Sequence, residues 1–163
     1  MDAYIKIDGI KGDCMVNDFK DWIVVQSFDH GVSQVGTATS MSAGGGASSR
    51  CEHGDFCFTK ELDLATPVLA LACCKGTHID NIKMSLCRAA GNKTLVYMEY
   101  QLKDVVISSI HNSGQYGSDN LPTEAVSLNY AEINWTYTHQ DRSGGGAKGN
   151  VATGWSLKQG GEK

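Results

Sequence analysis

The second half of the chain alternates apolar and polar residues, and within one run this alternation changes phase. Val126, Leu128 and Tyr130 take every second position, and Ile133 and Trp135 continue with the opposite parity. A period of two predicts a strand with one buried face. Because a change of phase moves side chains to the other face, it predicts an extra residue in the strand, which is a β-bulge.

Two of the predicted strands are too long to lie in a flat sheet. The runs 94–110 and 123–138 would each reach roughly 50 Å if they were straight, at about 3.3 Å per residue. In the first run, Asp104 would fall on the apolar face, so the strand must bend or bulge there. Strands of this length must coil around a closed or nearly closed antiparallel β-barrel, with bulges at its corners.

Shorter alternating runs predict the remaining strands and a turn. These strands are 3–7, 22–32, 56–62, 82–88 and 151–157, and the turn is 91–92. No composition shift marks a domain boundary, and 163 residues suit one domain. The sequence therefore predicts a single domain, 1–163, that is mainly β.

One short α-helix is predicted over about 66–75. Thr66 is a good N-cap, Pro67 suits the first helical position, and Gly76 is a good stop. The body of the segment is apolar nearly all round, which is typical of a largely buried helix. We expect it to close one end of the barrel or to pack against a neighbour.

Charge and apolar patterning exclude several classes of protein. The formal net charge is -4 and the 14 lysines and arginines are scattered, so no basic stripe for nucleic acid is present. No apolar run reaches the ~18 residues of a membrane span. The first residues lack the basic and apolar regions of a cleaved signal peptide. The six cysteines are expected to be free thiols, as in cytosolic proteins.

A search for catalytic chemistry finds no motif. The chain has no P-loop, no G-x-S-x-G elbow and no H-E-x-x-H, and its five histidines are isolated in the sequence. The nearest approach to a metal cluster is Cys51-x-His53-x-x-x-Cys57, which lacks a fourth ligand at a customary zinc spacing. We therefore expect no enzyme activity, no cofactor and no metal.

Several segments, in order along nearly the whole chain, resemble one known family. They are Tyr4-Ile5-Lys6-Ile7-Asp8-Gly9-Ile10-Lys11-Gly12, Gly31-Val32-Ser33-Gln34, Phe58-Thr59-Lys60, Thr66-Pro67 with Leu71-Ala72-Cys73, Gly76-Thr77-His78, Asp104-Val105-Val106-Ile107-Ser108-Ser109, Pro122-Thr123-Glu124-Ala125-Val126-Ser127-Leu128-Asn129 and Gly154-Trp155-Ser156-Leu157. Their order and spacing are similar to those of the hemolysin-coregulated protein family, the tube protein of bacterial type VI secretion.

The resemblance implies a β-barrel with one helix that assembles into hexameric rings. Such rings stack into a hollow tube, which a sheath surrounds and a spike caps. Small effector proteins ride in the lumen, so family members also act as effector chaperones. The route implies a cytoplasmic subunit that is later secreted without a cleaved signal peptide. Some family members carry a C-terminal toxin domain, and no such extension is expected here. Phe28-Asp29-His30-Gly31 departs from the family's aromatic-x-aromatic-glycine.

Two sets of residues are candidates for contacts within such an assembly. By their position in the resembling segment, Ser27 and Asp29 are predicted to face the lumen and its cargo; the alternative is a polar strand end that only meets solvent. The small residues of the long loop 35–54 are predicted to reach over a neighbouring subunit or ring, and a surface loop without such a contact is the alternative. The loop residues are Gly44, Gly45, Gly46, Ser48 and Ser49.

Two other classes of function remain open at this point. A monomeric carbohydrate- or peptide-binding barrel would expose aromatic side chains from among Trp22, Trp135 and Trp155. A hydrolase with catalytic residues dispersed over its loops is the second alternative. The sequence offers no nucleophile with an obvious partner, so the tube subunit is the preferred interpretation.

Overall fold

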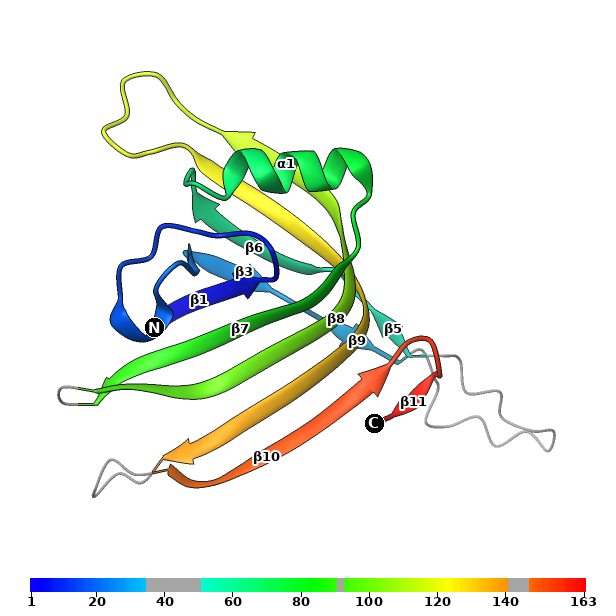
Figure 1. The fold of residues 1–163 in the computed structure, drawn as a ribbon. Helices are drawn as coiled ribbons and strands as arrows, with labels where there is room; N and C mark the ends of the chain where they lie inside the picture. The colour runs from blue at the N-terminus through cyan, green and yellow to red at the C-terminus, as the bar shows by residue number, and fades with distance from the viewer. Residues whose placement is uncertain (35–50, 91–92, 141–146) are drawn as a thin grey trace.

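The computed structural model describes residues 1–34, 51–90, 93–140 and 147–163, and within them the fold is mainly β with one α-helix, as predicted (Figure 1). A short 3-10 helix, η1, covers Asn17–Phe19. The other elements are β1 (Asp2–Ile7), β2 (Ile23–Val25), β3 (Ser27–Asp29), β4 (Val32–Ser33), β5 (Glu52–His53), β6 (Phe56–Glu61), α1 (Thr66–Lys75), β7 (Ile79–Ala90), β8 (Lys93–Ser113), β9 (Thr123–Gln140), β10 (Ala147–Ser156) and β11 (Gly161–Glu162).

An antiparallel sheet of nine strands organises the molecule. Its main order is β11-β10-β9-β8-β7-β1-β2, with β6 paired to β9 and β3 paired to β6. The long strands β7 to β10 lie side by side and curve, and α1 lies across the upper part of β8 and β9 in Figure 1. Because this order has two ends, the closed or nearly closed barrel remains a prediction. The predicted turn at 91–92 lies outside the described residues.

The long strands β8 and β9 change their buried face at the same level. Leu102 pairs with Ile133 and Val105 pairs with Tyr130, and all four side chains are buried. Since the register is the same on both sides of this point, β9 holds no extra residue, and the bulge predicted within it is wrong. The expected distortion of β8 is confirmed, because Asp104 has a left-handed φ of 50°.

The predicted strand 22–32 is wrong as a single element. It is divided into β2, β3 and β4, and the first break is at Gln26. There the chain changes partner, since β2 pairs with β1 while β3 pairs with β6. The Gln26 backbone N–H donates to the Thr59 carbonyl at 2.8 Å. β4 leaves the large sheet and pairs with β5 as a separate two-stranded ribbon.

Helix α1 has the predicted bounds, but it begins differently from the prediction. Ala65 occupies the N-cap position, so the assignment of Thr66 as N-cap is wrong. The cap is replaced by Asp63, whose carboxylate accepts from the Ala65 N–H at 2.9 Å. Gly76 ends the helix as predicted, with φ 60° and an N–H donated to the Cys73 carbonyl.

The sequence predicts a largely buried helix, and the exposed surface of α1 shows that this prediction is wrong. Leu69 and Ala72 face the core, whereas Val68 is 45% exposed and Leu71 is 52% exposed. The apolar residues outside the core-facing stripe therefore lie at the surface. In the part of the chain that the structure describes, no helix has the length and apolar character needed to cross a membrane.

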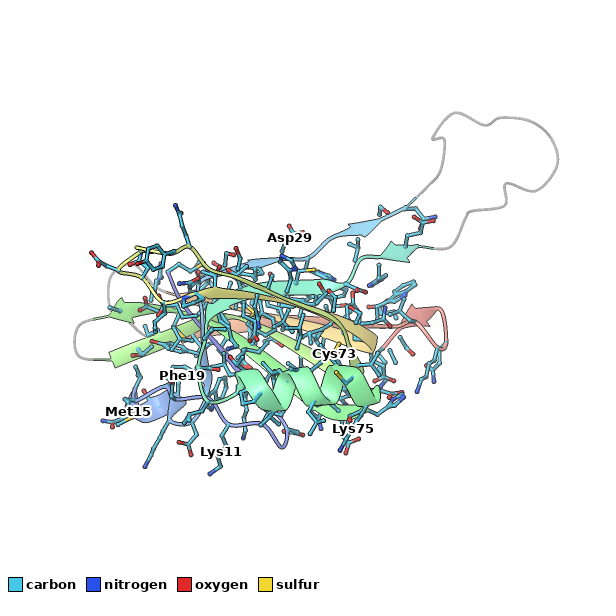
Figure 2. The ribbon with its side chains drawn as sticks, turned by 90° about the horizontal axis from the view of Figure 1, so that it is seen from above. Lys11, Met15, Phe19, Asp29, Cys73 and Lys75 are labelled. Atoms are coloured by element: carbon cyan, nitrogen blue, oxygen red, sulfur yellow. The ribbon has the colours of Figure 1, made fainter. Side chains whose placement is uncertain are left out.

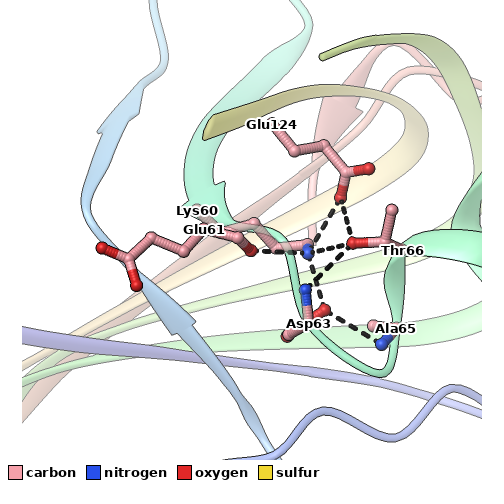
Figure 3. Close-up of polar contacts among 6 residues, drawn as sticks. All are labelled: Lys60, Glu61, Asp63, Ala65, Thr66 and Glu124. Carbon is pink, nitrogen blue, oxygen red and sulfur yellow. Dashed lines mark hydrogen bonds and ion pairs between the residues drawn. The ribbon is translucent and has the colours of Figure 1, made fainter. Parts of the chain in front are cut away.

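A buried ion cluster joins the start of α1 to the sheet (Figure 3). The Lys60 Nζ lies 2.9 Å from the Glu124 Oε2 and 2.6 Å from the Asp63 Oδ1, and it donates to the Thr66 Oγ1 at 2.9 Å. Lys60 and Glu124 are directly opposite in the β6–β9 pair and fully buried. This cluster fixes the β6–α1 connection against β9, which also fixes the edge of the sheet that carries β3.

Candidate functional site

Ser27 and Asp29 lie together on an exposed sheet face that β3, β6, β9 and β8 build. Ser27 is opposite Thr59, Asp29 is opposite Cys57, and Cys57 is in turn opposite Ser127. Directly opposed residues share a face. The surface that they define is called the polar face here, and its residues are Ser27, Asp29, Asp55, Cys57, Thr59, Glu61, Val106, Ser108, Ser109, His111, Ser113, Thr123, Ala125, Ser127 and Asn129.

Small polar side chains hydrogen-bond to one another across the strands of the polar face. The hydroxyls of Ser27 and Thr59 are 2.6 Å apart, and the Cys57 thiol lies 3.3 Å from the Ser127 hydroxyl. Each such pair links two neighbouring strands without a long side chain rising above the sheet. The face therefore presents hydroxyl and amide groups close to the backbone.

Asp55 precedes β6 and places its carboxylate on the same face. Its Oδ2 accepts from the Ser108 hydroxyl at 2.6 Å, and its Oδ1 accepts from the Asn129 amide at 2.9 Å. Ser108 is the extra residue at the one register shift of β8 against β9, between Ile107 and Ser109. The bulge thus turns the Ser108 hydroxyl outward to meet Asp55.

The other side of the same strands is the apolar core. Phe56, Phe58, Val126 and Leu128 are all fully buried there. In Figure 2, Asp29 lies on one side of the sheet, whereas Cys73 and Lys75 of α1 lie on the other. The polar face is therefore backed by core packing and turned away from α1, which leaves it open to a partner or to solvent.

Beside the polar face, His30 and His53, which are isolated from each other in the sequence, both approach one hydroxyl. The Tyr130 hydroxyl is 2.6 Å from the Nε2 of His30 and 3.0 Å from the Nδ1 of His53. With both rings neutral, the phenol can donate to one ring and accept an N–H from the other. The His30 ring also stacks on Phe56, with centroids 5.4 Å apart.

Burial favours the neutral form of every member of this cluster. It lowers the pKa of His30, which nearby His53 lowers further and Asp29 raises. It also lowers the pKa of His53. The pKa of Tyr130 is raised by burial first, and then by its electrostatic interaction with the nearby Asp55 and Cys51. The cluster is therefore a neutral hydrogen-bonded anchor for the β4–β5 ribbon, which makes no backbone pair with the large sheet among the described strands.

The segment that came nearest to a metal motif does not converge. His53 bonds to Tyr130, while the Cys57 thiol bonds to Ser127 and the Asp55 carbonyl. Within residues 1–34, 51–90, 93–140 and 147–163, no three His, Cys, Asp or Glu side chains are arranged to hold a metal ion. All six cysteines are free thiols. The predicted contact residues Gly44, Gly45, Gly46, Ser48 and Ser49 lie outside the described residues.

The three tryptophans give the binding-module alternative little support. Trp135 and Trp155 are half-buried and pack against the main core, and both approach the His53 ring, with centroids 6.3 and 6.2 Å away. Trp22 is half-buried in a second apolar cluster, where it meets the edge of Phe19. None of them is an open platform for a sugar ring or a peptide.

Comparison with known proteins assigns the chain to a family. A family model described as type VI secretion system effector, Hcp, matches residues 4–137. The protein hcp1 of Pseudomonas aeruginosa is 37% identical over 105 residues, which are 64% of this chain and 64% of that relative. The match thus spans a little less than two thirds of that relative's length.

Solved structures agree with this assignment over nearly the whole chain. A structure of a type six secretion system protein has a TM-score of 0.91 and 31% identity, covering 99% of each chain. The crystal structure of Hcp1 from Salmonella typhimurium has a TM-score of 0.79 and 25% identity, covering 99% of this chain and 98% of that one. The chain therefore belongs to the Hcp family of type VI secretion system proteins.

Proposed function

We propose that this chain is a non-catalytic tube subunit, which forms hexameric rings that stack into the inner tube of a type VI secretion apparatus. Membership of the Hcp family supports this function. The observation that carries it is the polar face, because a subunit of a water-filled tube needs one side of its sheet to be polar and open. Small side chains backed by a rigid apolar core meet that need.

We propose that the sheet closes around its core as a barrel within each subunit. The order of strand pairs supports closure, because β6 joins β9 on one side and β3 on the other, while β2 joins β1. Only Gln26 separates β2 from β3. Pairing can therefore be followed from β1 through β7, β8, β9 and β6 to β3, and the chain then continues through Gln26 into β2, which pairs with β1.

We propose that the polar face lines the lumen of the ring, with Ser27 and Asp29 in contact with small effector proteins. Both side chains are exposed on β3, and Phe28 between them turns inward against the core. A charge reversal, Asp29→Lys, should leave the ring intact and change the retention of a lumen cargo. If Asp29→Lys abolishes the ring instead, Asp29 lies in a subunit interface.

The remaining parts of the proposal concern assembly and export. Gly44, Gly45, Gly46, Ser48 and Ser49 would contact a neighbouring subunit or the next ring, and deletion of 44–49 should weaken stacking. Unchanged tubes after that deletion would contradict the contact. Sheath and spike proteins would be the further partners. The subunit would assemble in the bacterial cytoplasm and then leave the cell with the tube.

The first experiment is the mass of the purified chain by light scattering, followed by negative-stain images of the same peak. A ring with six-fold symmetry and a central hole is the expected result. A monomer at every accessible concentration would contradict the proposal. The monomeric binding module would then become the preferred function.

A further inference from the structure

Three carboxylates lie on the polar face, and its residues include no lysine or arginine. Asp29 is on β3, Glu61 is at the end of β6, and Asp55 is held between Ser108 and Asn129. The cation nearest in sequence is Lys60, but its side chain points to the opposite side of the sheet, where Glu124 and Asp63 neutralise it. The negative charge of the face is therefore not cancelled by the face itself.

The partners of the three carboxylates are all neutral. Glu61 accepts from the Gln26 amide at 3.2 Å, and Asp55 accepts from a hydroxyl and an amide. Asp29 is exposed; among the described side chains no hydrogen bond or ion pair holds it, and its charge acts on the adjacent His30, whose pKa it raises. Neutral donors orient a carboxylate without removing its charge. The face thus presents carboxylate acceptors, two of them oriented by neutral donors, among hydroxyl groups above an apolar core.

From this arrangement we infer that the polar face binds a protein partner through a surface rich in lysine and arginine. The inference rests on the proposed function and deepens it, because it names the chemistry of the cargo that the lumen would take. A surface that carries charge of one sign attracts a partner of the opposite charge. Complementary charge also excludes unsuitable partners, since an acidic protein or a nucleic acid would be repelled.

Ring assembly strengthens the same effect. Each subunit adds the same carboxylates to a shared lumen, so a cargo inside it meets negative charge from every direction. Contacts of this kind weaken as salt rises, because the screening length is only about 8 Å at physiological ionic strength. The hydroxyl and amide groups beside the carboxylates can complete hydrogen bonds to the cargo once charge has drawn it in.

Two probe proteins of similar size and fold but opposite charge test the inference: cationic lysozyme and anionic α-lactalbumin. Each is mixed with the assembled full-length chain at low ionic strength, and binding is measured by co-elution and by titration calorimetry. Lysozyme is expected to bind to the chain and to be released as the salt concentration is raised, whereas α-lactalbumin is expected to elute separately and to give no binding heat. Equal binding of the two probes, or lysozyme binding that salt does not weaken, would overturn the inference.

Two matched triple variants then locate the interaction. Asp29→Asn with Asp55→Asn and Glu61→Gln removes the charges of the polar face, and we expect lysozyme to bind roughly tenfold more weakly. Asp8→Asn with Asp18→Asn and Asp80→Asn removes equal charge from exposed positions elsewhere, and it should bind lysozyme as the wild type does. Equal losses in both variants would mean that net charge, and not this face, attracts the probe.

Two further measurements separate the inference from the proposed function. Asp29→Asn alone removes no hydrogen bond or ion pair among the described residues and only takes away the charge that raises the pKa of His30, so it reports on the face even where the triple variant fails to fold. Light scattering shows whether rings are present in each sample. If the chain stays monomeric, the tube function fails, yet the same lysozyme comparison on the monomer still tests the face. If rings form and the face variants bind lysozyme unchanged, only the inference fails.

Discussion

The Nε2 of His30 lies 2.6 Å from the hydroxyl oxygen of Tyr130, although the two residues are 100 positions apart in the chain. The same hydroxyl also meets the Nδ1 of His53 at 3.0 Å. One phenol on β9 therefore joins the residue that follows β3 to the end of β5. Since β4 and β5 form a ribbon outside the large sheet, this shared hydroxyl anchors the ribbon's base.

Tyr130→Phe should destabilise the fold by about 1–3 kcal/mol, because it leaves two half-buried imidazole nitrogens without their partner. Urea unfolding followed by tryptophan fluorescence measures the loss. Tyr116→Phe is the matched control, since Tyr116 is fully exposed and its variant should unfold as the wild type does. Equal midpoints for wild type and Tyr130→Phe would show that the hydroxyl bonds contribute nothing to stability.

Acid should weaken the fold through the same cluster. The pKa values of His30 and His53 are lowered from 6.5 in the folded state, so the unfolded chain takes up protons first as the pH falls. Stability from these residues is therefore fully present above pH 6.5 and is lost below it. Asp29 opposes the shift at His30 and reduces the effect.

Urea midpoints measured across this range test the pH dependence. The double variant His30→Gln with His53→Gln should lose most of the decline between about pH 7 and pH 5.5. His111→Gln removes an exposed histidine outside the cluster and should keep the wild-type profile. A double variant that declines as steeply as the wild type would assign the acid sensitivity to other groups.

Lys60→Met should be among the most damaging single substitutions. It leaves the Glu124 and Asp63 carboxylates without their cation in the core, at a cost of about 3–5 kcal/mol. Lys83→Met breaks the half-exposed pair with Glu99 and should cost less than about 1 kcal/mol. Thermal and urea unfolding compare the two variants, and similar losses would contradict the assignment of the Lys60 cluster as buried and ionic.

Helix α1 offers a matched pair of leucines. Leu69 is fully buried, so Leu69→Ala should lower the free energy of unfolding by about 2–5 kcal/mol. Leu71 is half exposed, so Leu71→Ala should change it by about 0.5 kcal/mol or less. The measurement is urea unfolding at one protein concentration. A large loss for Leu71→Ala, together with a change in mass by light scattering, would reveal that a second copy covers this residue.

The sequence allowed good predictions where the decisive signals are local. Pro67 and Gly76 bracket α1 within a few residues, and both bounds of the helix were predicted. The distortion at Asp104 was also predictable, since an acidic residue interrupts an apolar alternation. Ser27 and Asp29 could be placed on one face because strand parity is a local property. The prediction that these two side chains face the lumen rested only on the family resemblance.

Contacts between distant segments could not be read from the pattern. His30, His53 and Tyr130 come from three separate segments, and no spacing rule links them. Asp55 was missed because it precedes a strand, and the Ser108 bulge that meets it depends on the β8–β9 register. The break at Gln26 was missed because 22–32 was interpreted as one strand with Ser27 and Asp29 on the face of Ile23 and Val25, whereas the buried parity changes between Val25 and Phe28 where the strand partner changes.

Both strands of the β8–β9 hairpin change their buried face at the level of Asp104, and this level is called the crease here. In β8 the even-numbered Leu102 points inward below the crease, and the odd-numbered Val105 points inward above it. In β9 each half therefore carries its own parity rule, whereas in β8 the parity changes once more at the Ser108 bulge, beyond which the even-numbered Ile110 packs against the core. A single-residue deletion within one half of β9 would turn that half inside out, while the other half, if its pairing is kept, would still present the correct side chains to its core.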